Sequence, residues 1–458
     1  MKNIQIKVSK RVMIYGAPIE IKNLIQKKYT IPNPVFWENH KRGRNNHDIE
    51  KDIEVYKRNR AMISVPLGCL EDIMQMFNKK GIVFNLVDLR KTAPVKFAFK
   101  GQLKDFQQPA CRAMVEYDTG TLQAATGAGK TVMGLRIVAE RSQRTLILVH
   151  TKELLNQWID RIQTFLDCTR AEIGIIGGGK FRIGRRITVG MVQTVCNRLN
   201  EIKREFGMIV TDECHRCPSK TFSEVVESLY CKYTLGLSAT PFRRDGLTKF
   251  IFWYLGPVRH KVDRNNLFDI GQIVNPIFYK RETNFTSSYS FQRNYQGAMG
   301  DLVCNFARNV LVCKDVKEEY DKGETCLVLT DRKGHCTAMA DILCHKFNLP
   351  VSILTGSTKT KERKNIVSGI NSGNIKLIVA TGQLIGEGFD SNNLSCMFLT
   401  TPLKFSGRVL QYIGRVMRPS KSGDRPKVYD YVDVLEPVLR KSFDSRVTVY
   451  GKENVREK

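Results

Sequence analysis

A short glycine-rich segment has the residue types and spacing of a phosphate-binding loop. Residues 124–131 read Ala-Ala-Thr-Gly-Ala-Gly-Lys-Thr. Such a turn lets consecutive backbone N–H groups point at one anion, and the helix expected at residues 131–140 directs its positive dipole end there. Lys130 adds charge for the β- and γ-phosphates, and the Thr131 hydroxyl can hold Mg²⁺. We therefore predict that a nucleoside triphosphate binds against Thr126, Gly127, Ala128, Gly129, Lys130 and Thr131.

The loop departs from the general phosphate-loop pattern at one position. That pattern has a glycine five residues before Gly129, where this chain has Ala124. The alternative interpretation is a glycine-rich turn at the end of a strand with an incidental lysine. Gly-x-Gly-Lys-Thr is more specific than a bare glycine-rich loop, and it favours triphosphate binding.

Two adjacent carboxylates, Asp212 and Glu213, follow an apolar segment at residues 208–211. Hydrolysis of a nucleoside triphosphate needs magnesium, an oriented water and neutralisation of charge in the transition state. Asp212 is placed to hold Mg²⁺ with Thr131, and Glu213 can take a proton from water. A buried carboxylate pair is costly unless a cation lies beside it, which favours a metal site over an ordinary strand end.

Two arginines near the other end of the chain can supply the remaining positive charge. Arg415 and Arg418 are three residues apart, so they share one face of a helix. Guanidinium groups on one face can reach a γ-phosphate across a gap between two domains. A surface helix with solvated arginines is the alternative. The predicted catalytic set is Lys130, Asp212, Glu213, Arg415 and Arg418.

Alternation of strand-like and helical segments predicts two α/β domains with parallel sheets that position these residues. In the first domain, polar clusters follow the strands, and that edge of an open parallel sheet binds ligands. The second domain has no phosphate loop and carries the two arginines instead. The predicted strands are residues 121–125, 145–149, 187–189, 208–211 and 233–237 in the first domain, and 325–329, 351–354, 377–380, 396–399 and 427–432 in the second.

The charge and the pattern together predict four segments. Residues 1–92 form a small basic α/β DNA-binding domain, 93–258 the first nucleotide-binding domain, 259–300 a connection and 301–458 the second domain. Residues 1–100 hold 20 Lys and Arg against 9 Asp and Glu, and the whole chain carries a net charge of +28. Nucleic acid is the favoured partner for this charge, and a solvated basic surface is the alternative.

Two aromatic residues in the small domain precede a basic loop. Phe36 and Trp37 come just before the loop that contains Arg42 and Arg44. Basic residues beside exposed aromatics suit contact with phosphates and stacking on bases. An equal alternative is a turn whose aromatic residues belong to the core.

The composition limits the class of protein. No run of about 18 apolar residues occurs, so we expect no membrane span. The 13 cysteines are scattered and odd in number, which suits reduced thiols in the cytoplasm. Cys214 and Cys217 form a lone Cys-x-x-Cys with no second pair at zinc-finger spacing, so a metal or redox role is disfavoured.

Eight short motifs follow one another between about residues 103 and 433. They are Gln107, residues 127–131, Thr151-Lys152, Gln193-Thr194, Asp212-Glu213-Cys214-His215, Ser238-Ala-Thr, residues 381–390 and residues 411–418. This order resembles the two RecA-like domains of superfamily 2 DNA helicases of the Asp-Glu-x-His type. The resemblance implies tandem parallel sheets with helices on both faces, ATP and Mg²⁺ as cofactors, and a nucleic-acid substrate.

The resemblance adds residues to the predicted site. Gln107 would read adenine, and Glu387, Gly388 and Asp390 would lie at the nucleotide, in a loop between nucleotide and strand. Short hydroxyls and N–H groups at strand ends bond phosphates without reading bases, so binding would be independent of sequence. For each threonine, an ordinary helix cap is the alternative. The implied contacts with nucleic acid are Thr151, Lys152, Gln193, Thr194, Thr355 and Thr381.

Two longer stretches resemble one branch of the superfamily. Thr151-Lys-Glu-Leu-Leu-Asn-Gln-Trp and Ser238-Ala-Thr-Pro-Phe-Arg-Arg-Asp are similar to the XPB-like branch. That branch often has Arg-Glu-Asp where this chain has Arg243-Arg244-Asp245, and the resemblance assigns Arg243 to nucleic acid. Val65-Pro-Leu-Gly and Val87-Asp-Leu-Arg90 resemble the small domain of bacteriophage branch-migration helicases of the UvsW type, including those of T-five-like phages.

We therefore predict an ATP-dependent DNA helicase that acts on forked or branched DNA in replication, recombination or repair. It would bind DNA without sequence preference, work with replication or recombination proteins and, in a phage, act in the host cytoplasm. One alternative is an RNA helicase or the motor subunit of a restriction or defence system. Another, from a different class, is a DNA-clamping protein with ATP as a switch, although Asp212, Glu213 and the arginine pair count against it.

Overall fold

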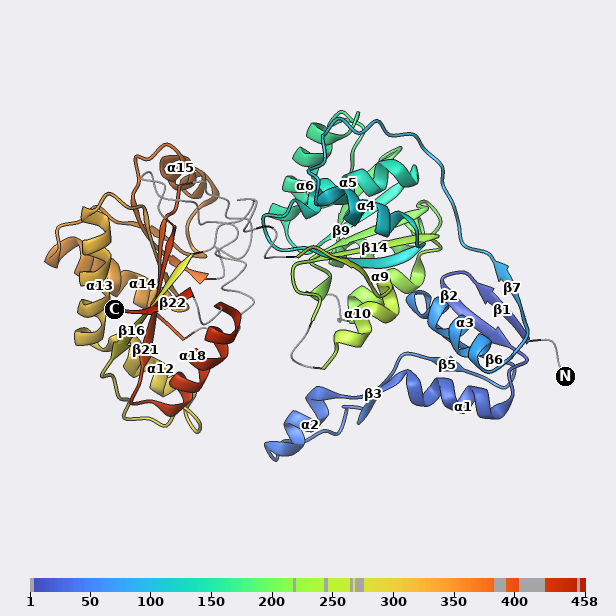
Figure 1. The fold of residues 1–458 in the computed structure, drawn as a ribbon, viewed down its shortest axis with the longest axis horizontal. Helices are drawn as coiled ribbons and strands as arrows, with labels where there is room; N and C mark the ends of the chain where they lie inside the picture. The colour runs from blue at the N-terminus through green and yellow to red at the C-terminus, as the bar shows by residue number, and fades with distance from the viewer. Residues whose placement is uncertain are drawn as a thin grey trace. The chain divides into compact units, whose positions relative to one another are not determined.

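The computed structural model describes residues 4–216, 220–242, 246–263, 267, 276–382, 393–402, 425–450 and 454–458. The chain divides into two units: Met1–Ala125 with Gly129–Asp263, and Arg264–Lys458 with Thr126–Ala128. Figure 1 shows that each unit contains a sheet with helices packed on it. Within the described ranges, no helix is both long enough and apolar enough to cross a membrane.

The first unit begins with a small five-stranded sheet. Its strands lie in the order β5 (Lys57–Arg58), β6 (Met62–Pro66), β2 (Arg11–Tyr15), β1 (Ile4–Val8) and β7 (Phe84–Asp88). Buried residues alternate along β1, as expected for a strand with one face on a core. Helix α1 (Ile19–Lys28), the 3₁₀ turn η1 (Leu67–Cys69) and helix α3 (Leu70–Lys79) complete this core through side chains such as Ile25 and Phe77. We call residues 4–90 the small domain.

An arm, residues 30–54, leaves the small domain between α1 and β5 (Figure 1). Strands β3 (Thr30–Pro32) and β4 (Asp52–Glu54) pair antiparallel as its stem, and helix α2 (Pro34–Lys41) lies beyond them. Asn33 caps α2 by accepting a hydrogen bond from the Val35 N–H at 3.1 Å. No residue of α2 is buried. Phe36 and Trp37 therefore lie on an exposed helix and not in a turn.

The small domain packs tightly against the larger domain that follows it in the first unit. Gly68 has no side chain at a point where a Cβ atom would lie only 2.7 Å from the Trp253 carbonyl oxygen. The buried Arg11 guanidinium donates a hydrogen bond to the Glu227 carboxylate, and Lys57 Nζ lies 3.0 Å from that same carboxylate. A buried charge is costly without its partner, so these contacts hold the two domains as one body.

The larger domain of the first unit, here the first α/β domain, has an eight-stranded sheet. The order is β11, β10, β12, β9, β13, β14, β8 and β15, and every pair is parallel except the β10–β11 hairpin. The strands are β8 (Thr119–Gln123), β9 (Thr145–Val149), β10 (Gly174–Gly177), β11 (Lys180–Arg182), β12 (Ile187–Met191), β13 (Met208–Asp212), β14 (Tyr233–Ser238) and β15 (Val258–Lys261). All residues of β9 and β13 are buried, which explains their unbroken apolar runs.

Helices connect these strands, as parallel pairing requires. The connections are α4 (Gln107–Val115), α5 (Lys130–Arg141), α6 (Lys152–Phe165), α7 (Val192–Cys196), α8 (Leu199–Ile202), the 3₁₀ turn η2 (Cys214–Arg216), α9 (Lys220–Ser228) and α10 (Thr248–Leu255). Helix α6 buries Leu155, Trp158, Ile159 and Ile162 on one face, the spacing of an amphipathic helix.

The second unit contains a seven-stranded sheet in which every described pair is parallel. Its order is β18 (Ser352–Leu354), β19 (Leu377–Thr381), β17 (Cys326–Thr330), β20 (Cys396–Leu399), β21 (Lys427–Asp433), β16 (Ile277–Thr283) and β22 (Val455–Glu457). Its helices are α12 (Tyr295–Cys304), α13 (Phe306–Asp321), α14 (Lys333–Asp341) with the π-turn η3 (Ile342–Lys346), α15 (Thr360–Asn371) and α18 (Pro437–Tyr450). The predicted fold class, two parallel α/β domains after a small α/β region, is confirmed.

The segment predicted as a connection, residues 259–300, differs from the structure. β15 is an edge strand of the first sheet, and β16 lies between β21 and β22 in the second. β15 has no fully buried residue, so it lacks the apolar run that marks a strand in sequence. Helices α12 and α13 follow each other directly, because Asn305 accepts a hydrogen bond from the Arg308 N–H at 2.9 Å and starts α13.

The packing at Gly68 predicts that Gly68→Ala destabilises the protein by about 1–3 kcal/mol, because the added methyl group overlaps backbone atoms of α10. Urea unfolding measures this loss. Gly334→Ala is the control, since a Cβ atom at that exposed helical position meets nothing within 4 Å. Alanine there should be neutral or slightly stabilising. Equal stability of the two variants would contradict tight docking of the small domain.

Candidate active site

Three neighbouring strands of the first sheet end at one edge, and the predicted catalytic groups of the first unit follow them. β8 leads into the phosphate loop, β13 ends at Asp212 and β14 ends at Ser238. The Ser238 carbonyl oxygen accepts a hydrogen bond from the Ala124 N–H at 3.0 Å, which fixes the start of the loop to β14. The carboxyl edge of a parallel sheet is the usual place for a ligand.

The glycines of the phosphate loop are required by its backbone. Gly127 and Gly129 have φ angles of +87° and +81°, in the left-handed region that favours glycine. At Gly129 a Cβ atom would also lie 2.5 Å from Gln107 Nε2. Ala124, where the general pattern has glycine, is fully buried. The loop then passes directly into α5, whose first N–H groups are free to face an anion.

The Lys130 ammonium lies over the phosphate loop. Its Nζ donates to the carbonyl oxygens of Ala124 at 3.2 Å and Ala125 at 3.4 Å. Thr131 follows on the first turn of α5 and is half-buried. A cation held on the loop carbonyls is already close to the position that phosphate oxygens would occupy.

Gln107 lies beside the same loop. It is the first residue of α4 and is 5% exposed. Its side-chain oxygen accepts a hydrogen bond from the Lys104 N–H at 3.0 Å, while its amide nitrogen faces Gly129. The structure therefore brings Gln107 together with the phosphate loop, although the two are more than twenty residues apart in sequence.

Asp212 is buried and oriented by a residue that the sequence prediction did not include. Its Oδ2 accepts a hydrogen bond from Trp158 Nε1 at 2.9 Å, and its Oδ1 accepts one from the Glu213 N–H at 2.9 Å. Burial, and secondly the charge of Glu213, raises the pKa of Asp212 to about 6, against the opposing effects of Trp158 and Lys130. Such a carboxylate gains most from a divalent cation, so the donor set fits Mg²⁺.

Glu213 has an unusual backbone conformation. Its φ angle is +49°, which for a residue other than glycine costs of order 1–3 kcal/mol and is found at functional sites. Its carboxylate lies 3.4 Å from His215 Nδ1, and that nitrogen is 3.0 Å from Ser238 Oγ. Ser238 Oγ in turn accepts a hydrogen bond from the Thr240 N–H at 3.2 Å. A chain of polar contacts thus runs from Glu213 to the residues after β14.

A second histidine lies close to this group. His150 follows β9, and its Nε2 is buried without a hydrogen-bond partner among the described residues. Burial, with the nearby positive charges of Arg216 and His215, lowers the pKa of His150 to about 4, so the imidazole is neutral at pH 7. Its neighbour in sequence is Thr151, a predicted contact with nucleic acid.

The predicted nucleic-acid contacts of the first α/β domain lie at helix starts. Thr151 caps α6, because its hydroxyl accepts a hydrogen bond from the Leu154 N–H at 3.3 Å. Lys152 and Gln193 are exposed, and Thr194 is half-buried on α7. The capping role of Thr151 matches the alternative considered for the threonines and leaves its backbone N–H and its second lone pair for another partner.

Other predicted contacts lie on the arm and in the second unit. Trp37 is 37% exposed with Lys51 Nζ 5.5 Å from the centre of its ring, and Phe36 stacks on His40. Arg42 pairs with Glu38 at 2.6 Å, and Arg44 is exposed. In the second unit, Thr355 follows β18 and bonds to Ser357 at 2.8 Å, while Thr381 ends β19. The remaining candidates, Arg243, Glu387, Gly388, Asp390, Arg415 and Arg418, lie outside the described residues.

Two family models match the chain. The model described as "Type III restriction enzyme, res subunit" matches residues 100–243, and the model described as "Helicase conserved C-terminal domain" matches residues 307–420. The first range contains the phosphate loop, Asp212 and Glu213. The second contains β17 to β20 of the second unit and ends just after Arg418.

Three relatives are similar over most of this chain. L396 of Acanthamoeba polyphaga mimivirus, named as an ATP-dependent RNA helicase, is 28% identical over 78% of this chain and 69% of its own length. Helicase D10 of Escherichia phage T5 is 25% identical over 82% of this chain and 81% of its own. XPB2 of Sulfurisphaera tokodaii, named as a DNA 3'-5' translocase, is 27% identical over 70% of this chain and 79% of its own.

A solved structure has a similar fold. Dbp5 of S. cerevisiae, bound to RNA and ADP BeF3, matches 78% of this chain and 90% of its own with a TM-score of 0.55. The identity is 16%, so the likeness concerns the fold alone. It agrees with the parallel sheets of the two units.

The raised pKa of Asp212 predicts that Asp212→Asn stabilises the protein when Mg²⁺ and nucleotide are absent. Above pH 6 the ionised carboxylate destabilises the folded state, and below the unfolded pKa of about 3.9 this effect disappears. Since each pKa unit corresponds to about 1.4 kcal/mol, the free energy of unfolding should rise by up to about 3 kcal/mol at pH 8 and by less than about 1 kcal/mol near pH 4. Urea unfolding at both pH values measures it.

The exposed Asp160 gives the control, since Asp160→Asn should leave stability unchanged at both pH values. Millimolar Mg²⁺ should stabilise the unsubstituted protein, because a cation that binds only the folded state raises its stability, and should not stabilise Asp212→Asn. Lower stability of Asp212→Asn at pH 8 would contradict the conclusion that the ionised Asp212 carboxylate destabilises the folded state.

Proposed function

Because the chain belongs to superfamily 2 of the helicases, we propose that it uses ATP hydrolysis to move along DNA and to remodel forked or branched DNA by unwinding and branch migration. The observation that carries this proposal is the buried pair Asp212 and Glu213 beside a phosphate loop with a lysine. An ATP-binding protein without hydrolysis has no need for a second carboxylate there.

The residues of the candidate site in the first unit have distinct roles in this proposal. When bound, Mg²⁺ and ATP supply a charge-neutralised triphosphate that water can attack. Lys130 binds the β- and γ-phosphates, and Thr131 and Asp212 hold the metal. Trp158 positions Asp212 through its indole N–H. Glu213 orients the attacking water and takes its proton, and its contact with His215 fixes the carboxylate.

Further roles come from the family resemblance. We propose that Gln107 recognises adenine, since its amide already lies against Gly129 of the phosphate loop. Glu387, Gly388 and Asp390 would contact the nucleotide from the second unit. Arg415 and Arg418 would neutralise charge at the γ-phosphate in the transition state.

Movement along a strand requires contacts that ignore base identity. We assign these to Thr151, Lys152, Gln193 and Thr194 in the first unit, to Thr355 and Thr381 in the second, and to Arg243. Thr151 and Thr194 follow β9 and β12 at the same sheet edge as the phosphate loop, so nucleotide and strand share one scaffold.

The net charge of residues 1–100 favours a nucleic acid, and the name of one relative favours DNA over RNA. Residues 1–100 carry 11 more basic than acidic residues. XPB2 is named as a DNA translocase, whereas L396 is named as an RNA helicase. RNA unwinding is therefore the second candidate, and the motor subunit of a restriction or defence system is the third. A DNA clamp switched by ATP is the alternative from another class.

One experiment separates these candidates. The rate of ATP hydrolysis is measured with single-stranded DNA, duplex DNA, a fork, a four-way junction and RNA. The proposal expects stimulation by DNA, with the highest rates on the fork and junction. Stimulation by RNA alone would support the RNA helicase, and slow turnover on every substrate would support the clamp.

Glu213→Gln and Lys130→Ala should both abolish strand movement, by different routes. The first keeps the metal site but removes the base, so turnover should fall roughly 10²–10⁴-fold while ATP still binds. The second removes a charge from the phosphates, so ATP binding itself should weaken. Phosphate release measures the turnover, and titration with a fluorescent ATP analogue measures ATP binding. Near-normal turnover in Glu213→Gln would remove Glu213 from the mechanism.

The arm should contribute to binding of forks and junctions. Arg44 has no ion pair or hydrogen bond from its guanidinium among the described residues, and Trp37 presents part of its ring. The double variant Trp37→Ala/Arg44→Ala should bind a fork roughly tenfold more weakly, because base stacking alone is worth about 1–3 kcal/mol. Fluorescence anisotropy measures the affinity.

Point substitutions test the arm without disturbing the contact between the small domain and the first α/β domain. Removing residues 1–92 would leave Glu227 without Arg11 and expose the surface around Trp253. As a control, Val35→Ala changes an exposed apolar residue of the same helix and should have little effect. Unchanged fork binding by the double variant would contradict a role for the arm.

A further inference from the structure

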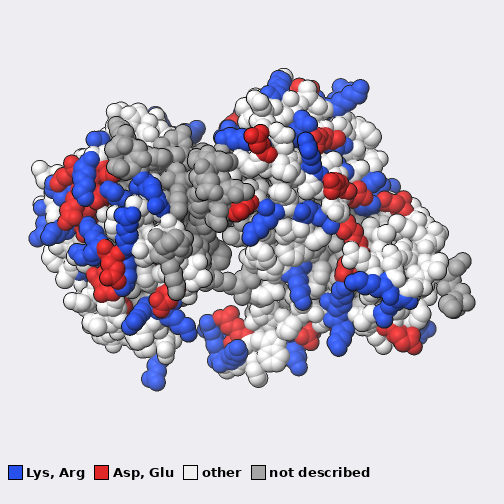
Figure 2. All heavy atoms as spheres, in the orientation of Figure 1, with Lys and Arg blue, Asp and Glu red and all other residues white. Residues whose placement is uncertain are grey.

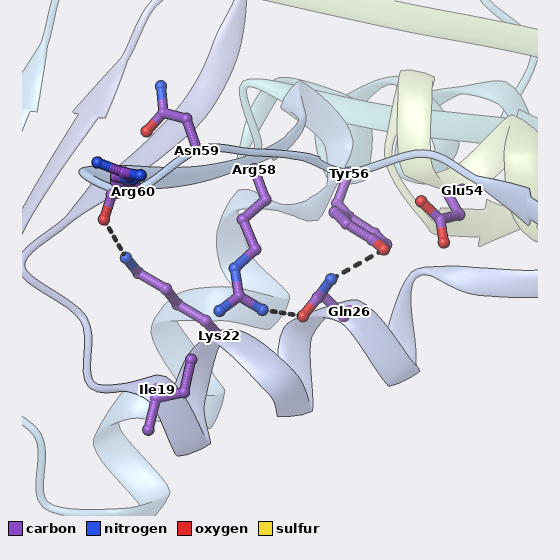
Figure 3. A pocket seen from close by; sticks show the side chains of 8 residues that line it. All are labelled: Ile19, Lys22, Gln26, Glu54, Tyr56, Arg58, Asn59 and Arg60. Carbon is purple, nitrogen blue, oxygen red and sulfur yellow. Dashed lines mark hydrogen bonds between the residues drawn. The ribbon is translucent and has the colours of Figure 1, made fainter.

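A groove lies on the small domain between α1 and residues 54–60, with a volume of about 630 Å³ (Figure 3). Two periodicities build it. Ile19, Lys22 and Gln26 share one face of α1, and residues 54, 56 and 58, which alternate, face them together with the two residues that follow. The lining residues of that segment are Glu54, Tyr56, Arg58, Asn59 and Arg60.

Three cations, Lys22, Arg58 and Arg60, line one part of this groove, and none of them pairs with a carboxylate of a described residue. Lys22 is only 8% exposed, and its Nζ donates a single described hydrogen bond, to the Arg60 carbonyl oxygen at 3.1 Å. Arg58 donates to the side-chain oxygens of Asn23, at 3.1 Å, and Gln26, which are both neutral. The Arg60 guanidinium makes no hydrogen bond or ion pair with any described residue.

An ammonium has three N–H donors, and a largely buried one is costly without an anion. Lys22 therefore has unused donors beside two further positive charges. Figure 3 shows the single acidic residue of the lining, Glu54, on the far side of Tyr56 from Arg58 and Arg60. One part of the groove is thus suited to an anion.

The remaining lining suits a sugar–phosphate chain better than a small anion. Tyr56 presents its ring beside the cations, and its hydroxyl accepts a hydrogen bond from Gln26 Nε2 at 2.9 Å. The groove is open along α1, and Figure 2 shows Lys and Arg side chains gathered over this region of the small domain. Cations next to an aromatic ring along an open groove are typical of contacts with a nucleic-acid backbone.

We propose that this groove binds the phosphodiester backbone of a duplex arm of DNA, with phosphates held by Lys22, Arg58 and Arg60. The inference rests on the proposed function, since it supplies a grip on a second arm of the branched substrate. It involves no base edges, so binding is independent of sequence.

The edge strand β5 connects this grip to the first α/β domain. Successive residues of a strand point to opposite sides. Arg58 faces the groove and donates to Gln26, while Lys57 faces away and lies 3.0 Å from Glu227 on α9. The duplex arm is therefore held by the same unit that contains Lys130, Asp212 and Glu213.

The test compares DNA binding by full-length protein with Arg58→Ala/Arg60→Ala and with Arg60→Ala alone. The Arg60 side chain makes no hydrogen bond or ion pair with any described residue, so its variant should fold normally. Fluorescence anisotropy without ATP measures affinity for a four-way junction, duplex DNA, single-stranded DNA and duplex RNA over a salt series. The control, Lys79→Ala/Lys80→Ala, removes two exposed charges at the end of α3 in the same domain.

We expect the double groove variant to bind junction and duplex DNA about tenfold more weakly at moderate salt, with the salt slope reduced by about 1.8 for two lost phosphate contacts. For Arg60→Ala, the salt slope should be reduced by half as much as for the double variant. ATP hydrolysis stimulated by single-stranded DNA should be unchanged.

Equal losses in the Lys79→Ala/Lys80→Ala control would overturn the assignment in favour of a general charge effect, and unchanged duplex binding in both groove variants would also overturn it. A loss confined to duplex RNA would overturn the choice of DNA. If the unsubstituted protein hydrolyses ATP without any stimulation by nucleic acid, the proposed function itself fails, which is a different result from a failure of the groove.

Discussion

The candidate active site depends on a buried carboxylate whose ionised form is destabilised by its surroundings. Asp212 lies in the interior beside a second carboxylate, and its pKa is raised to about 6 as a result. Trp158 on α6 holds the Asp212 carboxylate in place through its indole N–H, and Lys130 is near enough to offset part of the repulsion. A bound divalent cation would relieve the rest, so the free energy lost in folding would be regained when such a cation binds.

The polar contacts extend this constraint along the sheet edge. Glu213, in its left-handed conformation, connects through His215 to Ser238, and Ser238 also receives the first N–H of the phosphate loop. A change in charge at the carboxylates therefore alters the hydrogen bonds at the ends of β8 and β14 together. The distances between these groups are short, because the residues that follow neighbouring parallel strands are adjacent in space.

The sequence predicted what depends on local pattern and missed what depends on tertiary partners. Strands such as β9 and β20 match their apolar runs residue for residue, and the phosphate loop and Asp212 follow from their residue types. Trp158 lies in a stretch that resembles the XPB-like branch, yet its hydrogen bond to Asp212 joins residues 54 apart in sequence, and no local pattern predicts it. The sequence analysis did not find β15, because this edge strand lacks a run of buried residues. The cations of the groove come from α1 and from residues 58–60, more than thirty residues apart.

The Glu227 contacts with Arg11 and Lys57 also set a frame of reference for movement. They join the small domain to the first α/β domain within one compact unit, so whatever binds the groove or the arm would move together with Lys130, Asp212 and Glu213. If the first unit moves along a strand as proposed, a duplex bound in the groove would be carried over the same distance.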